Sequence, residues 1–198
     1  SERTSSSGVD TLVARITQQW DEPVRVIAVV LPEERSAIHL DMVLTMIDAN
    51  AALIYEPFVT GAARREVVSI HVPPQRKPHI EAHDNVLEAL AAAGVELETV
   101  ASGGTHEVAR QREQWLSGTN VFAFAPGKII GYDCNEATME SLARAGFAVR
   151  DVQEFTNGSE SVDDYDRLCV AMPGINLARG GGGPRCMTLP IFREPLSP

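Results

Sequence analysis

The sequence predicts an α/β protein in which short strands alternate with helices. Runs of β-branched residues of strand length recur along the chain, and the segments between them carry apolar residues at helical spacing. Neighbouring strand segments also lie too close together in the sequence for long parallel crossovers to dominate. No linker separates independent domains, so we expect residues 1–198 to form one unit of mixed strands and helices.

The N-terminal part of the chain predicts one helix followed by three strands. In order, these are a helix at 9–20 with capping hydroxyls in 4–7, a buried β-branched strand at 24–31 ended by Pro32, and strands at 38–47 and 52–55 separated by the turn-forming Asp48-Ala49-Asn50. A helix, three strands and the turn between the last two therefore come first.

The remainder predicts a second and a third group of strands and helices. The elements are a strand at 67–72, an alanine-rich helix at 80–93 ended by Gly94, a strand at 95–100, a helix at 107–115, a hairpin of 120–125 and 128–132 around Pro126-Gly127, a helix at 136–145 ended by Gly146, an extended segment at 147–152, a strand at 168–171 and a last strand at 187–192. The order strand, strand, helix, strand occurs twice in outline.

Composition excludes several classes of function. Acidic residues outnumber basic ones by 27 to 17, which gives a net charge of −10 and a surface that repels nucleic acid and anionic membranes. No apolar run is long enough for a membrane span or a signal peptide. Three widely separated cysteines, Cys134, Cys169 and Cys186, lack the spacing of a zinc site or a disulfide framework. They indicate a reducing, cytoplasmic setting.

His39 and Asp41 are the first candidates for chemistry. Alternate residues of a strand share one face, so a strand at 38–47 projects a proton carrier and a carboxylate side by side. An exposed strand edge with a surface His/Asp pair accounts for the same pattern. The spacing alone does not decide between these interpretations.

Cys186 follows the tetraglycine Gly180–Gly183 and stands next to Arg185. A neighbouring cation and exposed backbone N–H groups favour a thiolate, the form of cysteine that acts as a nucleophile. An inert, small apolar side chain at the start of a strand is the alternative, and Cys134 and Cys169 fit that description better. The glycines do not form a phosphate loop, because no Gly-Lys-Ser/Thr follows and the next element is a strand.

His79 and His83 lie four residues apart at the expected start of the helix at 80–93, with Glu81 between them. Such a pair can hold a metal ion when a third ligand is supplied. Since no third ligand is evident, the sequence favours a solvated helix face, and we expect no metal.

Several segments together resemble the arginine deiminase family of the guanidine-modifying, or pentein, superfamily. They occur in the family's order over almost the whole chain. The matching segments are Glu2-Arg3-Thr4-Ser5, His39-Leu40-Asp41, Arg112-Glu113-Gln114-Trp115, Pro126-Gly127 with Gly131-Tyr132-Asp133, and Asn176-Leu177 through Gly183-Pro184-Arg185-Cys186-Met187-Thr188-Leu189-Pro190.

The resemblance implies hydrolysis of L-arginine to L-citrulline and ammonia without a metal or organic cofactor. Cys186 is then the nucleophile that forms a covalent thiouronium, His39 the general acid and base, and Asp41 a carboxylate that grips the guanidinium. Arg3 is implied to lie at the substrate's α-carboxylate, and Arg185, beside the nucleophile, is a second substrate-binding arginine; which of the two meets the carboxylate stays open. Another guanidine substrate (agmatine, a methylated arginine or a peptidyl arginine) and a catalytically inactive binding or assembly module stay open.

The chain departs from the family pattern at its start. A second guanidinium-binding aspartate and a Glu-Gly-Gly-Asp segment precede, in the family, the residues matched by Ser1, which is not an initiator methionine. We therefore expect the C-terminal part of a single pentein-type catalytic domain, inactive alone. The expected fold is part of a five-bladed α/β propeller built from ββαβ modules. A homo-oligomer or a complementing N-terminal segment is left open as a partner.

Overall fold

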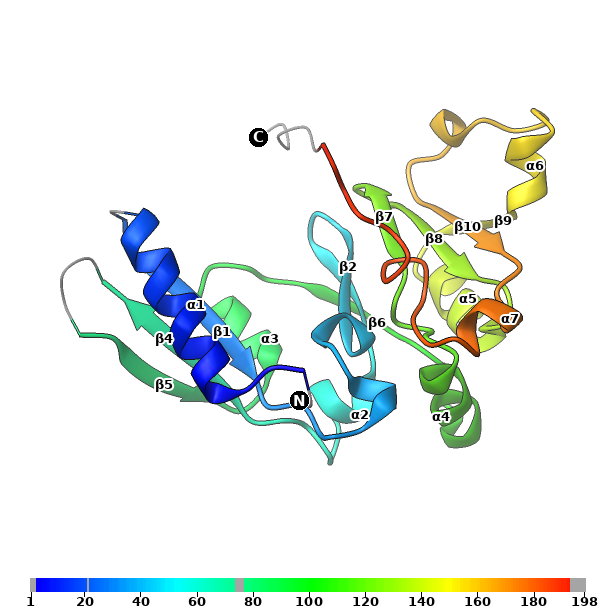
Figure 1. Ribbon diagram of the computed structural model, residues 1–198. Helices are drawn as coiled ribbons and strands as arrows, with labels where there is room; N and C mark the ends of the chain where they lie inside the picture. The colour runs from blue at the N-terminus through cyan, green and yellow to red at the C-terminus, as the bar shows by residue number, and fades with distance from the viewer. Residues whose placement is uncertain (1–2, 21, 74–76, 193–198) are drawn as a thin grey trace.

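A computed structural model describes residues 3–20, 22–73 and 77–192 of the chain (Figure 1). Its strands form three sheets, one of four strands and two of three, with helices laid against them. The predicted α/β class is confirmed. Among the described residues, no helix combines the length and the apolar composition that a membrane span requires.

The first sheet contains β1 (Val24–Val29), β4 (Val67–Val72) and β5 (His79–His83), all antiparallel, with β4 in the centre. α1 (Ser6–Gln19) contacts β1 and lies over one face of the sheet in Figure 1. Its N-cap is Ser5, whose hydroxyl accepts a hydrogen bond from the N–H of Gly8, so the predicted capping by hydroxyls is confirmed.

The second sheet contains β2 (Leu44–Asp48), β3 (Ala51–Ile54) and β6 (Glu98–Ala101). β2 and β3 form an antiparallel hairpin, and β6 pairs parallel with β3. Between β3 and β6 the chain forms α2 (Glu56–Val59), adds β4 and β5 to the first sheet, and returns through α3 (Val86–Ala91). All four residues of β3 are buried, which makes this strand the centre of the molecule.

The third sheet has the order β7-β8-β10-β9. β7 (Phe122–Ala125) and β8 (Lys128–Tyr132) form the predicted hairpin, while β10 (Leu168–Met172) lies parallel to and between β8 and β9 (Ala148–Asp151). Gly127 turns the hairpin with a φ of 72°, and a Cβ there would meet the Asp166 carbonyl oxygen at 2.7 Å, so the turn requires glycine.

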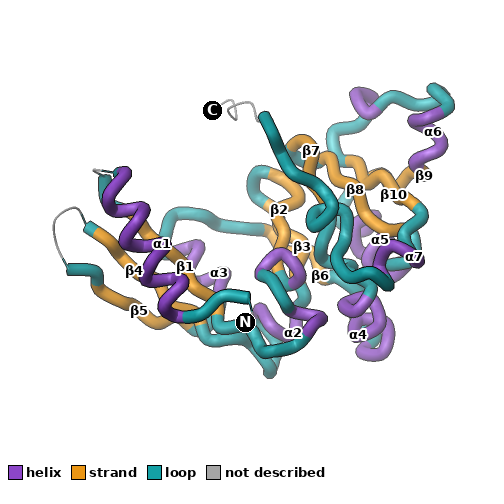
Figure 2. Tube along the Cα trace, viewed as in Figure 1, coloured by secondary structure: helices purple, strands orange, loops and turns teal. Residues whose placement is uncertain are grey.

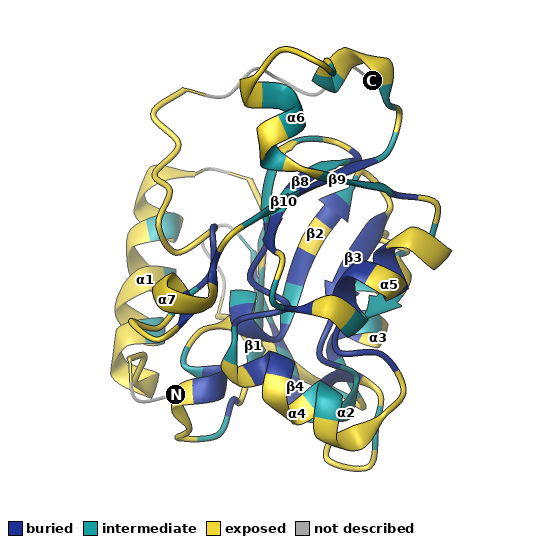
Figure 3. Ribbon diagram, turned by 90° about the vertical axis from the view of Figure 1, so that its right-hand side faces the viewer, coloured by how far each residue is buried: buried dark blue, intermediate teal, exposed yellow. Residues whose placement is uncertain are grey.

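The helices of the C-terminal half of the chain are α4 to α7, and several of them lie against the third sheet. α4 (Glu107–Trp115) and α5 (Glu136–Arg144) begin as predicted, and they are followed by the short α6 (Val152–Thr156) and α7 (Ile175–Ala178). Two apolar cores result: one joins the first sheet, α3 and β3, and the other joins β3, the third sheet and α5. Figure 3 shows the buried strand β3 in the interior and α1 exposed along most of its length.

The helix predicted at 80–93 is wrong in its first half. Residues 79–83 form β5, paired to β4, and α3 begins only after Asn85, whose side-chain oxygen accepts hydrogen bonds from the N–H groups of Leu87 and Glu88. This cap fixes the start of the helix, and the ladder with β4 satisfies the backbone before it. The high alanine content of this segment therefore led us to place the start of the helix too early.

Two predicted strands also need correction. The segment 38–47 is a strand only from Leu44, because residues 35–37 and 40–42 form short 3₁₀ turns. Residues 187–192 are irregular and exposed, without the strand pairing that was predicted. A strand needs a partner that satisfies its backbone, and no partner pairs with the described part of this segment.

The order strand, strand, helix, strand does occur as β7, β8, α5 and β9, but β10 lies between β8 and β9. The described residues form three separate sheets and no closed ring of them. The five-bladed propeller therefore stays a prediction.

Candidate functional site

Cys186 lies on an exposed loop that follows α7. The loop folds back on itself at Gly181 and Gly182, whose φ angles of 89° and 88° favour glycine. A Cβ on Gly182 would lie 2.7 Å from the Cβ of Cys186, so the glycine backbone covers one side of the cysteine. Figure 2 shows this segment as a loop that passes in front of the sheets.

Asp41 approaches Cys186 from a different part of the chain, the 3₁₀ turn Leu40–Met42 that precedes β2. One carboxylate oxygen of Asp41, Oδ2, lies 3.3 Å from Nε of Arg185. The other oxygen, Oδ1, is buried and accepts no hydrogen bond within the described residues. Asp41 thus binds one guanidinium and keeps a second acceptor available for an N–H group.

His39 and Arg3 are placed differently. His39 is exposed, adopts an extended backbone just before the 3₁₀ turn, and accepts a backbone hydrogen bond from Met42 through its carbonyl. Within the described part of the chain, no hydrogen bond joins its imidazole to Cys186 or Asp41. Arg3 is exposed in the turn before α1. The structure brings together Asp41, Arg185 and Cys186 from two loops, whereas the strand face predicted for His39 and Asp41 is wrong, because residues 40–42 form a 3₁₀ turn.

The environment of Cys186 favours the thiol over the thiolate. Burial of the sulfur by the folded loop raises its pKa most, and the negative charge of Asp41 raises it further. The N–H of Gly183, the side chain of Asn120 and the charge of Arg185 lower the pKa by less. The predicted activation by Arg185 is thus outweighed, because burial and the charge of Asp41 raise the pKa of Cys186 by more than Arg185 lowers it.

The other two cysteines have the inert settings that the sequence indicates. Cys169 lies in β10 with no exposed surface, and burial raises the pKa of its thiol to about 12. Cys134 is half-buried, and burial again raises its pKa. Cys186 is the exposed member of the set and therefore the accessible thiol.

Two buried side-chain amides that support this site were not singled out as functional from the sequence. The Nε2 group of Gln114 donates hydrogen bonds to the carbonyls of Ser36 and Met42, one on each side of His39 and Asp41. Asn120 contacts both the Asp41 turn and the Cys186 loop. The motif containing Gln114 signalled a family resemblance only, and nothing local distinguishes Asn120 from a surface asparagine.

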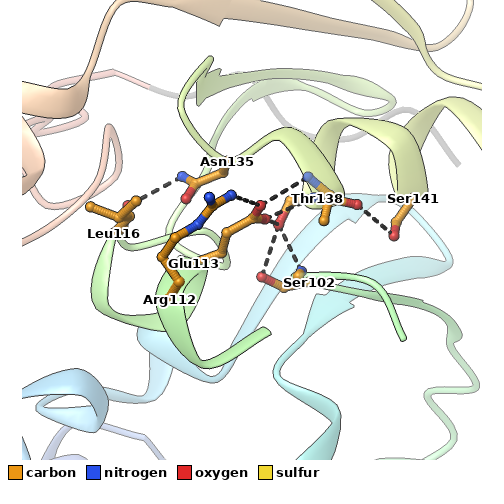
Figure 4. Close-up of polar contacts among 9 residues, drawn as sticks. Ser102, Arg112, Glu113, Leu116, Asn135, Thr138 and Ser141 are labelled. Carbon is orange, nitrogen blue, oxygen red and sulfur yellow. Dashed lines mark hydrogen bonds and ion pairs between the residues drawn. The ribbon is translucent and has the colours of Figure 1, made fainter. Parts of the chain in front are cut away.

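Glu113, next to Gln114, has a structural role that Figure 4 displays. Its carboxylate is fully buried and accepts hydrogen bonds from the N–H groups of Ala137 and Thr138 and from the Thr138 hydroxyl, at 2.7 to 2.9 Å. Arg112 adds a contact of 3.2 Å. Since the N-cap residue of α5, Asn135, makes no side-chain cap, Glu113 caps that helix from α4.

The histidines considered for metal binding lie on a strand instead of a helix. His79 stacks on His71 of β4 with ring centroids 4.4 Å apart, and His71 contacts Glu81 at 3.1 Å. His83 bonds to Ser69 at 2.8 Å. Among the residues that the structure describes, no group of three histidine, cysteine or acidic side chains is arranged to hold a metal ion.

Fold and site together describe an α/β protein in which one loop holds an exposed cysteine beside a carboxylate that binds a guanidinium. The family model for arginine deiminase matches residues 1–193. The chain therefore belongs to the arginine deiminase family.

Individual relatives agree with this assignment. The arginine deiminase of Oenococcus oeni is 29% identical over 198 residues, which cover 99% of this chain and 43% of that protein. The arginine deiminase of Listeria welshimeri is 32% identical, covering 99% of this chain and 44% of that protein. The arginine deiminase of Mycoplasma capricolum is 33% identical over a segment that covers 87% of this chain and 37% of that protein. The chain thus spans less than half the length of these curated relatives.

Proposed function

We propose that this chain carries the nucleophile of an arginine deiminase, which hydrolyses L-arginine to L-citrulline and ammonia. The observation that supports this most directly is the contact between Asp41 and the guanidinium of Arg185, beside Cys186. A carboxylate is suited to a guanidinium because both are planar and can form paired, charge-assisted hydrogen bonds. The buried, unpartnered Oδ1 of Asp41 is the acceptor that a substrate N–H requires.

In the proposed reaction Cys186 gives its thiol proton to neutral His39, and its sulfur attacks the guanidinium carbon of arginine to form a tetrahedral adduct. His39 protonates the departing nitrogen, so that ammonia leaves and a covalent thiouronium is left on the sulfur. His39, now neutral, takes a proton from a water molecule, which attacks the thiouronium carbon. Citrulline departs and the thiol is restored. The reaction needs no metal or organic cofactor.

The same roles require the site to change when arginine binds. Arg185 holds Asp41 in this structure, so the substrate guanidinium has to take the place of the Arg185 guanidinium. Arg185 is then available for the α-carboxylate of the substrate, where the family resemblance also places Arg3. His39 is exposed and has an extended backbone ahead of a short turn. The same rearrangement has to bring its imidazole to Cys186.

We further propose that the chain is the C-terminal part of a single pentein-type domain, a five-bladed α/β propeller of ββαβ modules. The coverage of the relatives and the three separate sheets support this. The remaining carboxylates for the guanidinium would come from the upstream part, joined or supplied as a complementing segment, and a homo-oligomer is compatible with this arrangement. Three free cysteines fit a cytoplasmic location.

A catalytically inactive binding or assembly module is the second candidate for the chain by itself. It is favoured by the raised pKa of Cys186 and by the lack of a hydrogen bond between His39 and Cys186 within the described residues. Agmatine, a methylated arginine or a peptidyl arginine are alternative substrates of the same chemistry. Turnover of each by the full-length protein distinguishes them from arginine.

The decisive experiment replaces the nucleophile in the full-length protein. We expect Cys186→Ala to abolish citrulline formation while circular dichroism stays that of the unchanged protein, because the side chain is exposed. Cys134→Ala is the matched control and keeps its activity. Citrulline formation by Cys186→Ala would refute the mechanism. For the 198-residue chain alone we expect a loss of at least about 10³-fold, because part of the guanidinium positioning is missing.

A further inference from the structure

Asn120 lies where the two halves of the candidate site meet. It precedes β7, has no exposed surface, and is separated in sequence from both Asp41 and Cys186 by more than sixty residues. A fully buried asparagine is costly unless its amide is hydrogen-bonded, so its partners reveal what the residue holds in place.

The partners of Asn120 belong to the two loops that carry the proposed catalytic residues. Its Oδ1 accepts hydrogen bonds from the N–H of Gly183 at 2.9 Å and from the N–H of Cys186 at 3.1 Å. Its Nδ2 donates to the carbonyl of Asp41 at 3.3 Å, and its backbone carbonyl accepts from the N–H of Arg185 at 3.4 Å. One residue therefore bridges the Asp41 turn and the Cys186 loop.

The chemistry of these partners defines which way the amide points. Gly183 and Cys186 present N–H donors, and Asp41 presents a carbonyl acceptor, so only the orientation with the oxygen toward the Cys186 loop satisfies all three. Aspartate can replace the acceptor but not the donor. Alanine replaces neither. This gives two variants that remove different parts of the bridge.

The contact with the loop is too close for another residue at position 183. A Cβ on Gly183 would lie 2.3 Å from the backbone oxygen of Asn120 and 2.9 Å from its Oδ1. The glycine therefore allows the loop backbone to reach Asn120, which explains one member of the tetraglycine by a contact inside the protein. The loop is held against Asn120 by fit as well as by hydrogen bonds.

We propose that Asn120 is a positioning residue of the deiminase site, which holds the Cys186 loop in register with the Asp41 turn. The inference rests on the proposed function for the roles of Cys186 and Asp41. Asn120 acts mainly through the backbone groups of these residues, and its side chain also lies beside the Cys186 thiol, whose pKa it lowers.

The test uses the 198-residue chain and compares Asn120→Ala with Asn135→Ala. Asn135 is equally buried and donates one side-chain hydrogen bond, to the carbonyl of Leu116, but it does not contact the Cys186 loop. Both truncations remove a buried amide, so a general loss of stability affects both. A loss of local order confined to the Cys186 loop is expected only in Asn120→Ala.

The first readout is amide hydrogen exchange in residues 183–186. Pro184 has no N–H, and the other three amides of this segment all donate to Asn120. We expect exchange at Gly183 and Cys186 to be about fivefold faster or more in Asn120→Ala, because their shared acceptor is lost. Exchange there stays unchanged in Asn135→Ala. Equal exchange in the two variants, or unchanged exchange in Asn120→Ala, would overturn the proposal.

The second readout is the pH dependence of Cys186 alkylation by iodoacetamide, resolved from the other cysteines by peptide mass spectrometry. Burial and Asp41 raise the pKa of Cys186 by more than Asn120 and Gly183 lower it. Release of the loop therefore shifts the alkylation midpoint of Asn120→Ala down, toward that of an ordinary cysteine. An upward shift would mean that the loop stays in place without Asn120 and would contradict the proposal.

Asn120→Asp keeps the proposal testable if the alanine variant does not fold. The aspartate retains an acceptor for Gly183 and Cys186, so exchange at these amides stays within about twofold of the unchanged chain. Fast exchange in a folded Asn120→Asp chain would overturn the role of Oδ1. None of these measurements requires turnover of arginine, so their failure is distinct from a failure of the proposed deiminase activity.

Discussion

The first and third sheets of this protein differ in how well they are covered. α1, over the first sheet, has no buried residue, and β5 is exposed along almost its whole length. α5, against the third sheet, buries four residues, and the first three residues of β10 are buried. The comparison indicates that the C-terminal part of the chain supplies most of the stable scaffold.

The candidate site is built on the second and third sheets and not on the exposed first sheet. The Asp41 turn leads into β2, Asn120 leads into β7, and Gln114 and Glu113 lie at the end of α4. Loops that carry functional residues are positioned most precisely when rigid elements hold their ends. The exposed first sheet contributes none of the residues around Cys186 named above.

The largest test of this comparison uses one substitution in both regions. Leu142 of α5 is completely buried, whereas Leu12 of α1 is 53% exposed. We expect Leu142→Ala to lower the free energy of unfolding by about 2–5 kcal/mol, because it opens a cavity in the second core. Leu12→Ala is expected to cost less than about 1 kcal/mol. Urea denaturation measures both, and equal costs would contradict the comparison.

A second test addresses the buried carboxylate that joins α4 to α5. Glu113→Ala leaves the N–H groups of Ala137 and Thr138 buried without their acceptor, so we expect a loss of about 2–4 kcal/mol. The matched control is Glu140→Ala on α5, whose exposed carboxylate contacts only Arg144 at 3.7 Å among the described ion pairs. That change is expected to lie within about 0.5 kcal/mol of zero. A Glu113→Ala chain as stable as the control would refute the capping role.

The smallest expected effect is a pH dependence of the free energy of unfolding, which arises from Cys169 in the third sheet. Burial raises the pKa of Cys169 to about 12 in the folded chain, so the unfolded chain loses its proton first as the pH rises. Stability is therefore full below the ordinary thiol pKa and falls above about pH 9, by up to about 1.4 kcal/mol per pH unit. Unfolding curves between pH 8 and 10 measure this decline. Cys169→Ala makes the decline shallower, and the same slope in that variant would assign the decline to other groups such as Cys134 and Cys186.

Elements whose signals are local were predicted well. α4 and the β7–β8 hairpin lie where helical spacing and Pro126-Gly127 placed them, because capping and turn chemistry act over a few residues. The strand at 38–47 failed because Gln114 holds the carbonyls of Ser36 and Met42 from more than seventy residues away. No pattern within the segment itself carries that information.

The candidate site was likewise predicted in part. The family resemblance selected Cys186, His39 and Asp41, and the structure brings the first and the last together; the role of each residue stays a prediction. The predicted pairing of His39 and Asp41 on one face of a strand was wrong, since residues 40–42 form a 3₁₀ turn. The predicted activation of Cys186 by Arg185 is outweighed by burial and by the charge of Asp41, and both of these depend on how the loops fold.

By itself, the sequence determined the α/β class, the position of most strands and helices, and a cysteine that follows a glycine-rich turn. These follow from periodicity, turn residues and chain composition, which are properties of neighbouring residues. Only the tertiary structure decided that Asn120 joins the Asp41 turn to the Cys186 loop, that Glu113 caps α5, and that the Cys186 thiol is favoured over its thiolate. Each of these depends on burial and on partners distant in sequence, because desolvation and hydrogen-bond satisfaction are settled only when the chain has packed.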